Sequence, residues 1–411
     1  MSLPLVEIPP QIRSLLSFYK KQFKRKQYKH FRNLITGLIA SDNKTIQEIN
    51  GCFGDNDQSS LNRFLTKSEW DVNSINDARI EQIIKMCHLG QGILICDPTL
   101  LHKTGKHMEK VNYHYSSITK KKELGHCLVN SFYTDNKNNS FPVRSDIYIR
   151  EIDADKEHTF KTTRQICLEQ LDYAVGKLPI WLFMADAGLY ADYLVQDIKA
   201  RCLKYVIGIR ITNKISIDGK KRISVEEYLN TLTDKDFNFY FKGGNAYFLH
   251  TKEIMTRGVG KEKLLISYKS GDEETIKIYT TNLLNVSDET LMTLLLKRWE
   301  IECWHKDAKQ NLGLEDYQVR KFGAIQKVVC AVLVAYTQIF LSKRQAILSP
   351  FKRALETIGE GCRFLRLIAL KGWKWVREKS KDIGEFTKIL NNQVFVKNAK
   401  VLSLTKNPNR F

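Results

Sequence analysis

The 411-residue chain lacks several features that would place it in a specialised class of protein. It has no run of 18 or more apolar residues, so we expect no membrane span. Its first residues do not follow the basic, apolar and small-residue order of a secretion signal, and no internal repeat or low-complexity segment is present. Its nine cysteines are scattered without a CxxC pair, which indicates reduced thiols in a cytosol rather than a disulfide framework or zinc site.

Acidic residues are scarce relative to basic ones. The 65 Lys and Arg against 45 Asp and Glu give a formal net charge of +20. An excess of this size favours a polyanion partner, most simply nucleic acid, although an ordinary basic protein is the alternative. No lysine-rich disordered tail accounts for the charge. The length and the 43% of hydrophobic residues predict two to four domains with large cores.

Residues 1–90 are predicted to form a helical DNA-binding domain. Over 11–40 apolar residues recur at helical spacing, interleaved with basic and aromatic residues, a pattern that suits a DNA backbone or an ordinary amphipathic helix. Helices over 44–52 and 59–65, joined by a glycine-containing turn, resemble a helix-turn-helix, although short helical hairpins are common. The second helix would expose residues of base-reading types, namely Gln58, Ser59, Asn62 and Arg63.

From residue 91 the pattern changes to strands. Predicted strands cover 92–97, 123–135, 141–149, 179–186 and 204–211, with helices over 160–175 and up to residue 199. Three strands followed by helix, strand, helix and strand is the order of a ribonuclease-H-like core. Residues 212–285 contain four further strand candidates separated by glycine-containing turns, which predicts a β-rich antiparallel insertion.

The fold class expected from this order is α/β. A ribonuclease-H-like mixed sheet with a β-rich insertion would be flanked by helical N- and C-terminal domains. The catalytic core would span 91–345 and end with a strongly apolar core helix over 324–343. Residues 346–411 would form a helical, basic C-terminal region that serves DNA contact or dimerisation.

A predicted helix from Ser287 to Gly313 changes character along one face. Arg298, Glu302, His305 and Lys309 fall at i, i+4, i+7 and i+11 and therefore share one stripe, which upstream consists of leucines. A core-facing stripe that carries one carboxylate and several cations is typical of a site that binds both a metal ion and a phosphate backbone. The alternative is a solvated face of ion pairs.

Two predicted strands end in an aspartate, Asp97 and Asp186. Pro98 is expected to take the chain out of the ladder directly after Asp97. If the strands are neighbours, their ends bring the two carboxylates together, and Glu302 is a third. Three carboxylates suit hard cations such as Mg²⁺, and two such ions would activate a water or 3′-hydroxyl for phosphodiester chemistry. For each aspartate alone, a turn-forming residue is the alternative interpretation.

The motif Arg298-x3-Glu302-x6-Lys309 resembles the R, E and K of the Y-R-E-K signature of DDE insertion-sequence transposases. The run RWEIECWHKDAK (298–309) is similar to the form found in hairpin-forming, cut-and-paste members. Segments 96–106 and 184–194 resemble the first and second aspartate segments, and 61–71 resembles the helical N-terminal segment. The resemblance implies a ribonuclease-H-like core with a β insertion between the second and third acids.

The resemblance also implies roles for particular residues. Asp97, Asp186 and Glu302 would be the catalytic triad and would bind two Mg²⁺ ions, for which Mn²⁺ would substitute. The DNA-binding candidates are Arg298, Lys309, Trp299, His305, Lys306, Lys103 and Lys106. The chain departs from the family in two places. Leu295 occupies the position of the signature tyrosine, and the insertion contains no tryptophan, so one of its other aromatic residues would have to stack on a flipped base.

The function implied is that of a metal-dependent DNA transposase, which cleaves at transposon ends and transfers the freed strand into target DNA. Its partners would be double-stranded DNA and a second copy of the chain in a synaptic homodimer. It would be a prokaryotic, nucleoid-associated cytoplasmic protein without a membrane partner. Two alternatives remain: a ribonuclease-H-like nuclease without strand transfer, and a domesticated, non-catalytic DNA-binding protein.

Overall fold

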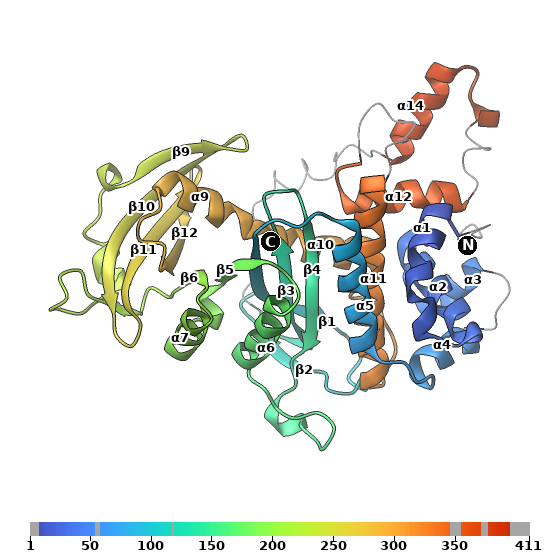
Figure 1. Ribbon diagram of the computed structural model, residues 1–411, viewed down its shortest axis with the longest axis horizontal. Helices are drawn as coiled ribbons and strands as arrows, with labels where there is room; N and C mark the ends of the chain where they lie inside the picture. The colour runs from blue at the N-terminus through green and yellow to red at the C-terminus, as the bar shows by residue number, and fades with distance from the viewer. Residues whose placement is uncertain (1–7, 54–57, 117–118, 346–354, 371–376, 395–411) are drawn as a thin grey trace.

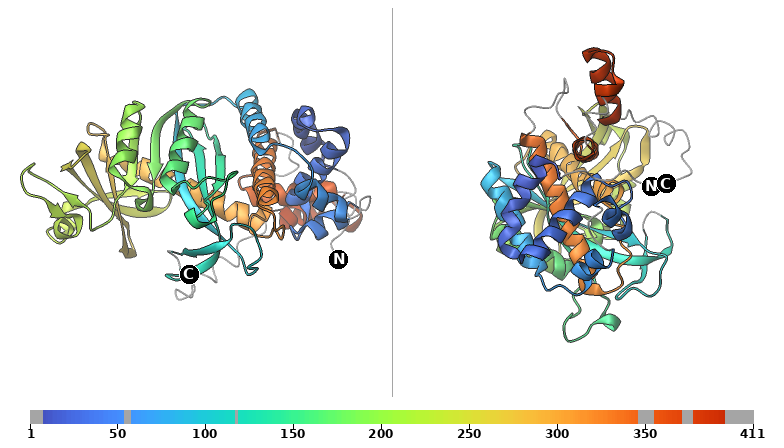
Figure 2. Two further views of the ribbon diagram at one scale, coloured as in Figure 1. Left: turned by 90° about the horizontal axis from the view of Figure 1, so that it is seen from below. Right: turned by 90° about the vertical axis from the view of Figure 1, so that its right-hand side faces the viewer.

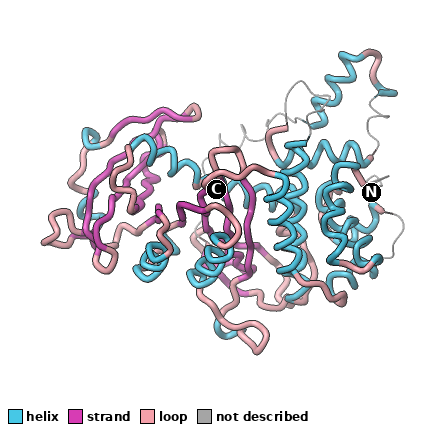
Figure 3. The backbone as a smooth tube through the Cα atoms, viewed as in Figure 1, coloured by secondary structure: helices cyan, strands magenta, loops and turns pink. Residues whose placement is uncertain are grey.

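The chain forms a mixed sheet with a strand-rich part at one end and helices at the other (Figure 1, Figure 3). This computed structural model describes residues 8–53, 58–116, 119–345, 355–370 and 377–394. The strands are β1 (Gly92–His102), β2 (Asn112–Tyr115), β3 (Lys122–Thr134), β4 (Ser140–Ile147), β5 (Ile180–Ala185), β6 (Lys204–Gly208), β7 (Lys214–Ile215), β8 (Ile223–Ser224), β9 (Asn238–Lys242), β10 (Asn245–Thr256), β11 (Gly260–Lys269) and β12 (Asp272–Thr281). The helices are α1 (Pro10–Leu16), α2 (Arg25–Ala40), α3 (Ile46–Cys52), α4 (Gln58–Thr66), α5 (Val72–Met86), α6 (Thr163–Val175), α7 (Asp192–Ala200), α8 (Val225–Leu229), α9 (Asp288–Lys297), α10 (Trp299–Leu312), α11 (Phe322–Gln345), α12 (Ile358–Ala369) and α14 (Ile383–Val394), with 3₁₀ turns η1 (Ser17–Gln22), η2 (Glu151–Asp153), η3 (Ala187–Leu189) and η4 (Asp234–Asp236).

The sheet places β1, β5 and β6 side by side as parallel neighbours. The full order is β2-β3-β1-β5-β6-β12-β11-β10-β9, with β4 paired to β3. Strand β3 runs antiparallel to both β1 and β4, and α6 and α7 make the connections into β5 and β6. This is the ribonuclease-H-like arrangement that the sequence predicts, and the α/β fold class is confirmed.

The β-rich insertion continues the core sheet. Strand β12 pairs antiparallel with β6, and β11, β10 and β9 follow in order. The four predicted strands of the insertion are therefore present, and they lie at the end of the sheet away from the N-terminal helices (Figure 1). Strand β6 ends at Gly208, three residues before the predicted end.

Strand β1 extends beyond Asp97, so the prediction that Pro98 leaves the ladder is wrong. Pro98 lies opposite Val129 of β3, and the pairing continues to His102. Pairing with β5 ends at Cys96, so the rest of β1 has a neighbour on one side only, where a proline can be accommodated. The sequence pattern also missed the short strand β2, which pairs with β3.

The predicted helix over 11–40 is divided into α1, η1 and α2. Phe23 is extended between η1 and α2, and its ring packs at 4.5 Å from that of Phe31 and 5.7 Å from that of Trp70. Burial of these rings offsets the helical hydrogen bonds that are lost at the break. The helix-turn-helix-like pair corresponds to α3 and α4, whose connecting residues 54–57 lie outside the described chain.

The helix predicted from Ser287 to Gly313 is also divided, because α9 and α10 meet at Arg298. The N–H of Arg298 donates to Leu295, and the N–H of Ile301 donates to Arg298, so the helix tightens locally to i→i+3 bonds. Gly313, with a φ of 70°, ends α10 at the predicted residue.

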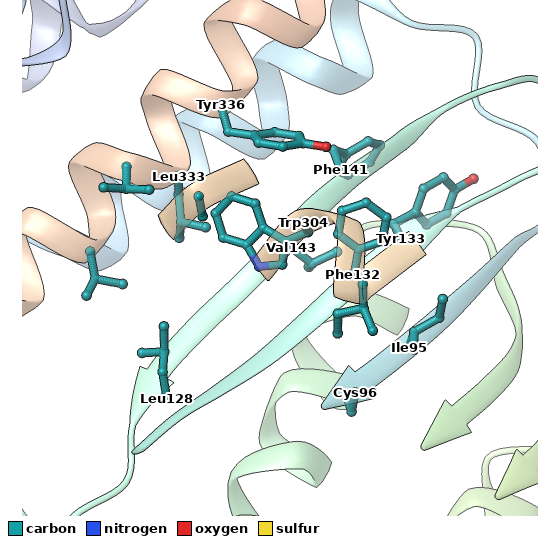
Figure 4. Packing of buried hydrophobic residues seen from close by; sticks show 14 of the residues in the cluster. Ile95, Cys96, Leu128, Phe132, Tyr133, Phe141, Val143, Trp304, Leu333 and Tyr336 are labelled. Carbon is teal, nitrogen blue, oxygen red and sulfur yellow. The ribbon is translucent and has the colours of Figure 1, made fainter. Parts of the chain in front are cut away.

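Trp304 fixes α10 between the sheet and α11. Its indole is 1% exposed and meets the Tyr336 ring of α11 edge-on, with 4.9 Å between ring centres. Figure 4 shows it among Phe132 and Val143 of the neighbouring strands. The buried face of α10 is thereby anchored, and its polar stripe is held in one orientation.

Helix α11 is long and apolar enough, over Phe322–Arg344, to cross a membrane by length and composition. In this fold 83% of its apolar 18-residue stretch is buried. It packs against α1, α2, α5 and β4. It is therefore the core helix predicted over 324–343.

The N-terminal helices lie against α11 and α12 (Figure 2). Asp42, just before α3, forms an ion pair with Arg366 of α12. Arg79 of α5 is fully buried and donates to the backbone carbonyls of Pro142 and Val143 in β4. The helices of both ends thus share contacts with the core, and the proposed domain boundaries remain predictions.

Candidate active site

Asp97 and Asp186 lie next to each other because of the register between β1 and β5. Cys96 pairs with Ala185, and each aspartate is the following residue. Asp186 precedes η3 and is exposed, whereas the side chain of Asp97 is 17% exposed. The two predicted strand ends therefore do meet at one point of the sheet.

Glu302 and Arg298 join this point from the start of α10. Arg298 Nη2 donates to Glu302 Oε1 at 2.5 Å, an i,i+4 ion pair with 11% and 30% of the side chains exposed. The charges of Asp97 and Asp186 also act on Arg298, so all three carboxylates favour its charged form. The structure brings together four residues that the sequence singled out.

Burial raises the pKa of Asp97 to about 7. The Arg298 charge opposes this rise, and the carboxylates of Asp186 and Glu302 add to it. Burial works against the charge of Arg298, but the surrounding acidic groups raise its pKa overall. With all groups ionised, three carboxylates against one guanidinium leave two negative charges in excess, which favours a bound cation.

His305 lies on the same stripe and faces β1 and β3. Its Nδ1 is 3.7 Å from Asp97 Oδ2, and its Nε2 is 3.0 Å from Asn130 Nδ2. Burial, together with the charges of Lys309 and Arg298, lowers the pKa of His305 to about 3, so the ring is neutral. In this structure His305 is thus a neutral group beside Asp97, and its contact with DNA stays a prediction.

Sequence reasoning missed two residues at the site. Asn130 is opposite Asp97 in the β1–β3 ladder and reaches His305. Tyr279 of β12 is 3% exposed and hydrogen-bonds Arg298, and burial raises its pKa. Both enter the site through strand pairing across long separations, for which the sequence carries no local signal.

The predicted DNA-binding lysines differ in exposure. Lys309 donates to the Leu100 carbonyl at 2.7 Å and pairs with Glu315 at 2.9 Å. Lys103 donates to the carbonyl of Glu315 at 2.5 Å and lies 3.3 Å from the centre of the Tyr317 ring. These two lysines are engaged within the fold.

The remaining candidates are on the surface. Trp299 is 58% exposed at the start of α10, and Lys306 is exposed one turn further along the helix from Glu302. Lys106 is exposed in the loop after β1. Leu295, at the position of the signature tyrosine, is buried in α9.

Within the described residues, no three Asp, Glu, His or Cys side chains are gathered tightly enough to hold a metal ion. One of the three carboxylates, Glu302, is paired with the Arg298 guanidinium instead. The donor set nevertheless consists of carboxylate oxygens, the ligand type that Mg²⁺ and Mn²⁺ prefer.

Comparisons with known proteins place the chain in a family. The family described as "DDE superfamily endonuclease" matches residues 18–226, and the family described as "Archaeal putative transposase ISC1217" matches residues 251–342. The chain is also similar to the "Probable transposase for insertion sequence element IS701" of Microchaete diplosiphon, with 26% identity over 333 residues, 76% of this chain and 82% of that protein. The chain belongs to the DDE superfamily of endonucleases and is an insertion-sequence transposase.

Proposed function

We propose that Asp97, Asp186 and Glu302 are the catalytic carboxylates of this DNA transposase. DDE enzymes depend on a divalent metal ion. The observation that supports this assignment is the placement of Asp97 and Asp186 directly after the last pair of the β1–β5 ladder, with Glu302 brought near them by α10. We further propose that the metal is Mg²⁺, with two ions bound and Mn²⁺ as a substitute. When bound, such ions supply activation of a water or 3′-hydroxyl and charge stabilisation of the leaving oxygen.

Arg298 has two roles in this proposal. In the free protein it neutralises part of the carboxylate charge through its bond to Glu302. If Glu302 turned from the guanidinium to hold a metal ion, Arg298 would become available to a DNA phosphate. The Tyr279 hydroxyl, which hydrogen-bonds Arg298, would keep the guanidinium in place during this exchange.

The reaction would take place in two phosphoryl-transfer steps. Hydrolysis at each transposon end breaks a P–O bond and frees a 3′-hydroxyl. This hydroxyl then attacks a phosphodiester of target DNA in line, so that a new P–O bond forms as the target's P–O bond breaks and its own 3′-hydroxyl leaves. A homodimer would hold the two ends together. We infer that the enzyme acts in a prokaryotic cytoplasm, at the nucleoid.

The test is Glu302→Gln, which keeps the size of the side chain but removes its charge. Cleavage of a duplex that carries the terminal repeat, and its joining to plasmid DNA, should both be lost while end binding persists. The control is Glu300→Gln on the same helix, where the carboxylate pairs with Lys297. Joining by the Glu302 variant at the wild-type rate would disprove the assignment.

The same gels separate the transposase from a nuclease of similar fold. A transposase yields joined products in which the end is linked to plasmid DNA, whereas a nuclease yields cleaved ends only. Binding by the wild type without any metal-dependent cleavage would instead indicate a non-catalytic DNA-binding protein.

A further inference from the structure

Lys309 lies at the far end of the α10 stripe and is neutralised within the chain. Its Nζ is 2.9 Å from Glu315 Oε1 and donates to the Leu100 carbonyl at 2.7 Å. The two side chains of the pair are only 22% and 27% exposed, so the pair is partly desolvated and stronger than a surface ion pair.

A second donor converges on the same carboxylate oxygen. The backbone N–H of His102, the last residue of β1, donates to Glu315 Oε1 at 3.3 Å. An ammonium group and a backbone N–H that meet at one anionic oxygen form the donor set of a phosphate site. Glu315 therefore occupies a place that is built for an anion.

The position of this place along α10 fits a bound DNA strand. Lys309 is seven residues from Glu302, which is about 10 Å along the helix axis at about 1.5 Å per residue. A phosphate held there would lie one to a few nucleotides from the proposed cleavage point. The stripe would then connect the catalytic carboxylates with a backbone contact.

The carboxylate of Glu315 has room to move away. Glu315, His102 and Lys103 line a hollow of about 700 Å³ between the start of α3 and the end of β1. Three other acidic residues line it, namely Asp42, Glu123 and Asp316, so the hollow itself does not suit DNA. The charge of Glu315 already acts on Lys103. Lys103 is therefore a second cation with which the displaced carboxylate could pair.

We propose that Glu315 competes with duplex DNA for Lys309. The resemblance implies a backbone phosphate at Lys309, and the Glu315 carboxylate, held by Lys309 Nζ and the His102 N–H, fills that place until DNA displaces it. The proposal rests on the proposed function, because it takes the bound strand to run along α10. Glu315 would then weaken DNA binding by competition, although it stabilises the free protein. If the Lys309–Glu315 pair had a purely structural role, removing Glu315 would weaken DNA binding rather than strengthen it.

The experiment measures binding by fluorescence anisotropy at several salt concentrations. The probes are a duplex with the terminal inverted repeat that flanks the reading frame and an unrelated duplex of equal length. The proteins are the wild type, Glu315→Gln, Lys309→Ala and the double variant. The control is Glu81→Gln, which makes the same charge change at an exposed ion pair of α5.

Glu315→Gln should tighten binding about 3- to 10-fold over the wild type, beyond any change in the Glu81 variant. Lys309→Ala should weaken binding and reduce the slope of log K against log salt by about one. In the double variant the gain from Glu315→Gln should vanish. A gain on the repeat duplex alone assigns the phosphate to the transposon end, and an equal gain on both duplexes assigns it to general backbone contact.

Equal or weaker binding by Glu315→Gln, in a variant that is still folded at the temperature of the assay, would overturn the proposal. If Glu315→Gln unfolds, Glu315→Ser is measured in its place, with the same prediction. A wild type that binds but does not cleave would contradict the catalytic assignment and leave this phosphate site standing, so the two failures are distinguishable.

Discussion

Glu262 of β11 is a buried carboxyl outside the proposed chemistry. Its side chain is fully buried, and Tyr205 donates its hydroxyl to Oε1 at 2.8 Å. Burial raises the pKa of Glu262, and the hydrogen bond from Tyr205 and the Lys199 charge only partly oppose the rise. The folded state therefore holds this proton more tightly than the unfolded chain.

The sign of the resulting pH effect follows from the raised pKa. The stabilisation from Glu262 is complete below the unfolded pKa of about 4.3 and is lost as pH rises through the folded pKa. Glu262→Gln should remove this part of the dependence and raise the melting temperature at pH 8 relative to the wild type. Thermal unfolding between pH 5 and pH 8 measures the difference.

Glu253, on the adjacent strand β10, is the control for this prediction. It is exposed, and its hydrogen bond and ion pair with Lys261 lower its pKa. Glu253→Gln should therefore not reduce the fall in melting temperature between pH 5 and pH 8 that Glu262→Gln reduces. Identical pH profiles for the Glu262 variant and the wild type would contradict the prediction.

The residues of the site differ in how far the sequence could locate them. Asp97 and Asp186 follow apolar runs, and Glu302 belongs to a motif within one helix, so local patterns predicted all three. Tyr279 and Asn130 reach the site through the pairing of β12 with β6 and of β3 with β1. Such pairing is decided by packing across the whole sheet, and no local pattern shows it.

At the scale of elements, the sequence predicted the kinds and order of the helices and strands better than their ends. The division at Phe23 depends on the contacts of its ring with the rings of Phe31 and Trp70, which form only when the chain folds. The extension of β1 past Pro98 depends on β3 continuing beside it after β5 has ended. In both cases tertiary contact overrides local propensity.

The contact between β6 and the Asp186 loop is the element-scale feature that fixes the second carboxylate. A Cβ at Gly208 would lie 2.5 Å from the backbone nitrogen of Ala187 and 3.1 Å from the carbonyl carbon of Asp186. Neither backbone atom can rotate away. Gly208→Ala must therefore move the segment that carries Asp186.

Gly208→Ala should lower the cleavage rate at least 10-fold, because small displacements of a catalytic group are costly. Binding to the terminal repeat should stay within 2-fold of the wild type, since the lysines proposed to bind DNA are elsewhere. Gly188→Ala is the matched control in the same loop, where a Cβ would meet nothing within 4 Å. Equal cleavage by both variants would show that the loop absorbs the change.

At the scale of the whole molecule, the insertion and the core share one sheet, and some buried residues of the insertion join the core's hydrophobic cluster while others form a second one. Leu249 and Leu265 of the insertion are fully buried in the same cluster as the core strands. Strand β6 has β12 as its neighbour on the side away from β5. The insertion is therefore part of the structural unit that positions the carboxylates, although it reads in sequence as a separate segment.

Replacement of residues 212–283 by a short glycine-serine linker should prevent stable folding. The loss of each buried leucine costs about 2–5 kcal/mol, and two such losses approach the total stability of about 5–15 kcal/mol of a typical domain. The deletion also exposes the edge of β6, which favours aggregation. The soluble fraction after expression and the cooperativity of thermal unfolding measure the effect.

A serine-glycine insert at the turn between Gly243 and Gly244 is the control, since a Cβ at either residue would meet open space. This insert should leave the melting temperature within a few degrees of the wild type, because the strand pairs around it are kept. If the deleted chain instead stayed soluble and unfolded cooperatively, the core sheet would be stable with β6 as an edge. The insertion would then be an accessory to DNA handling, and the positions of Asp97 and Asp186 would not depend on it.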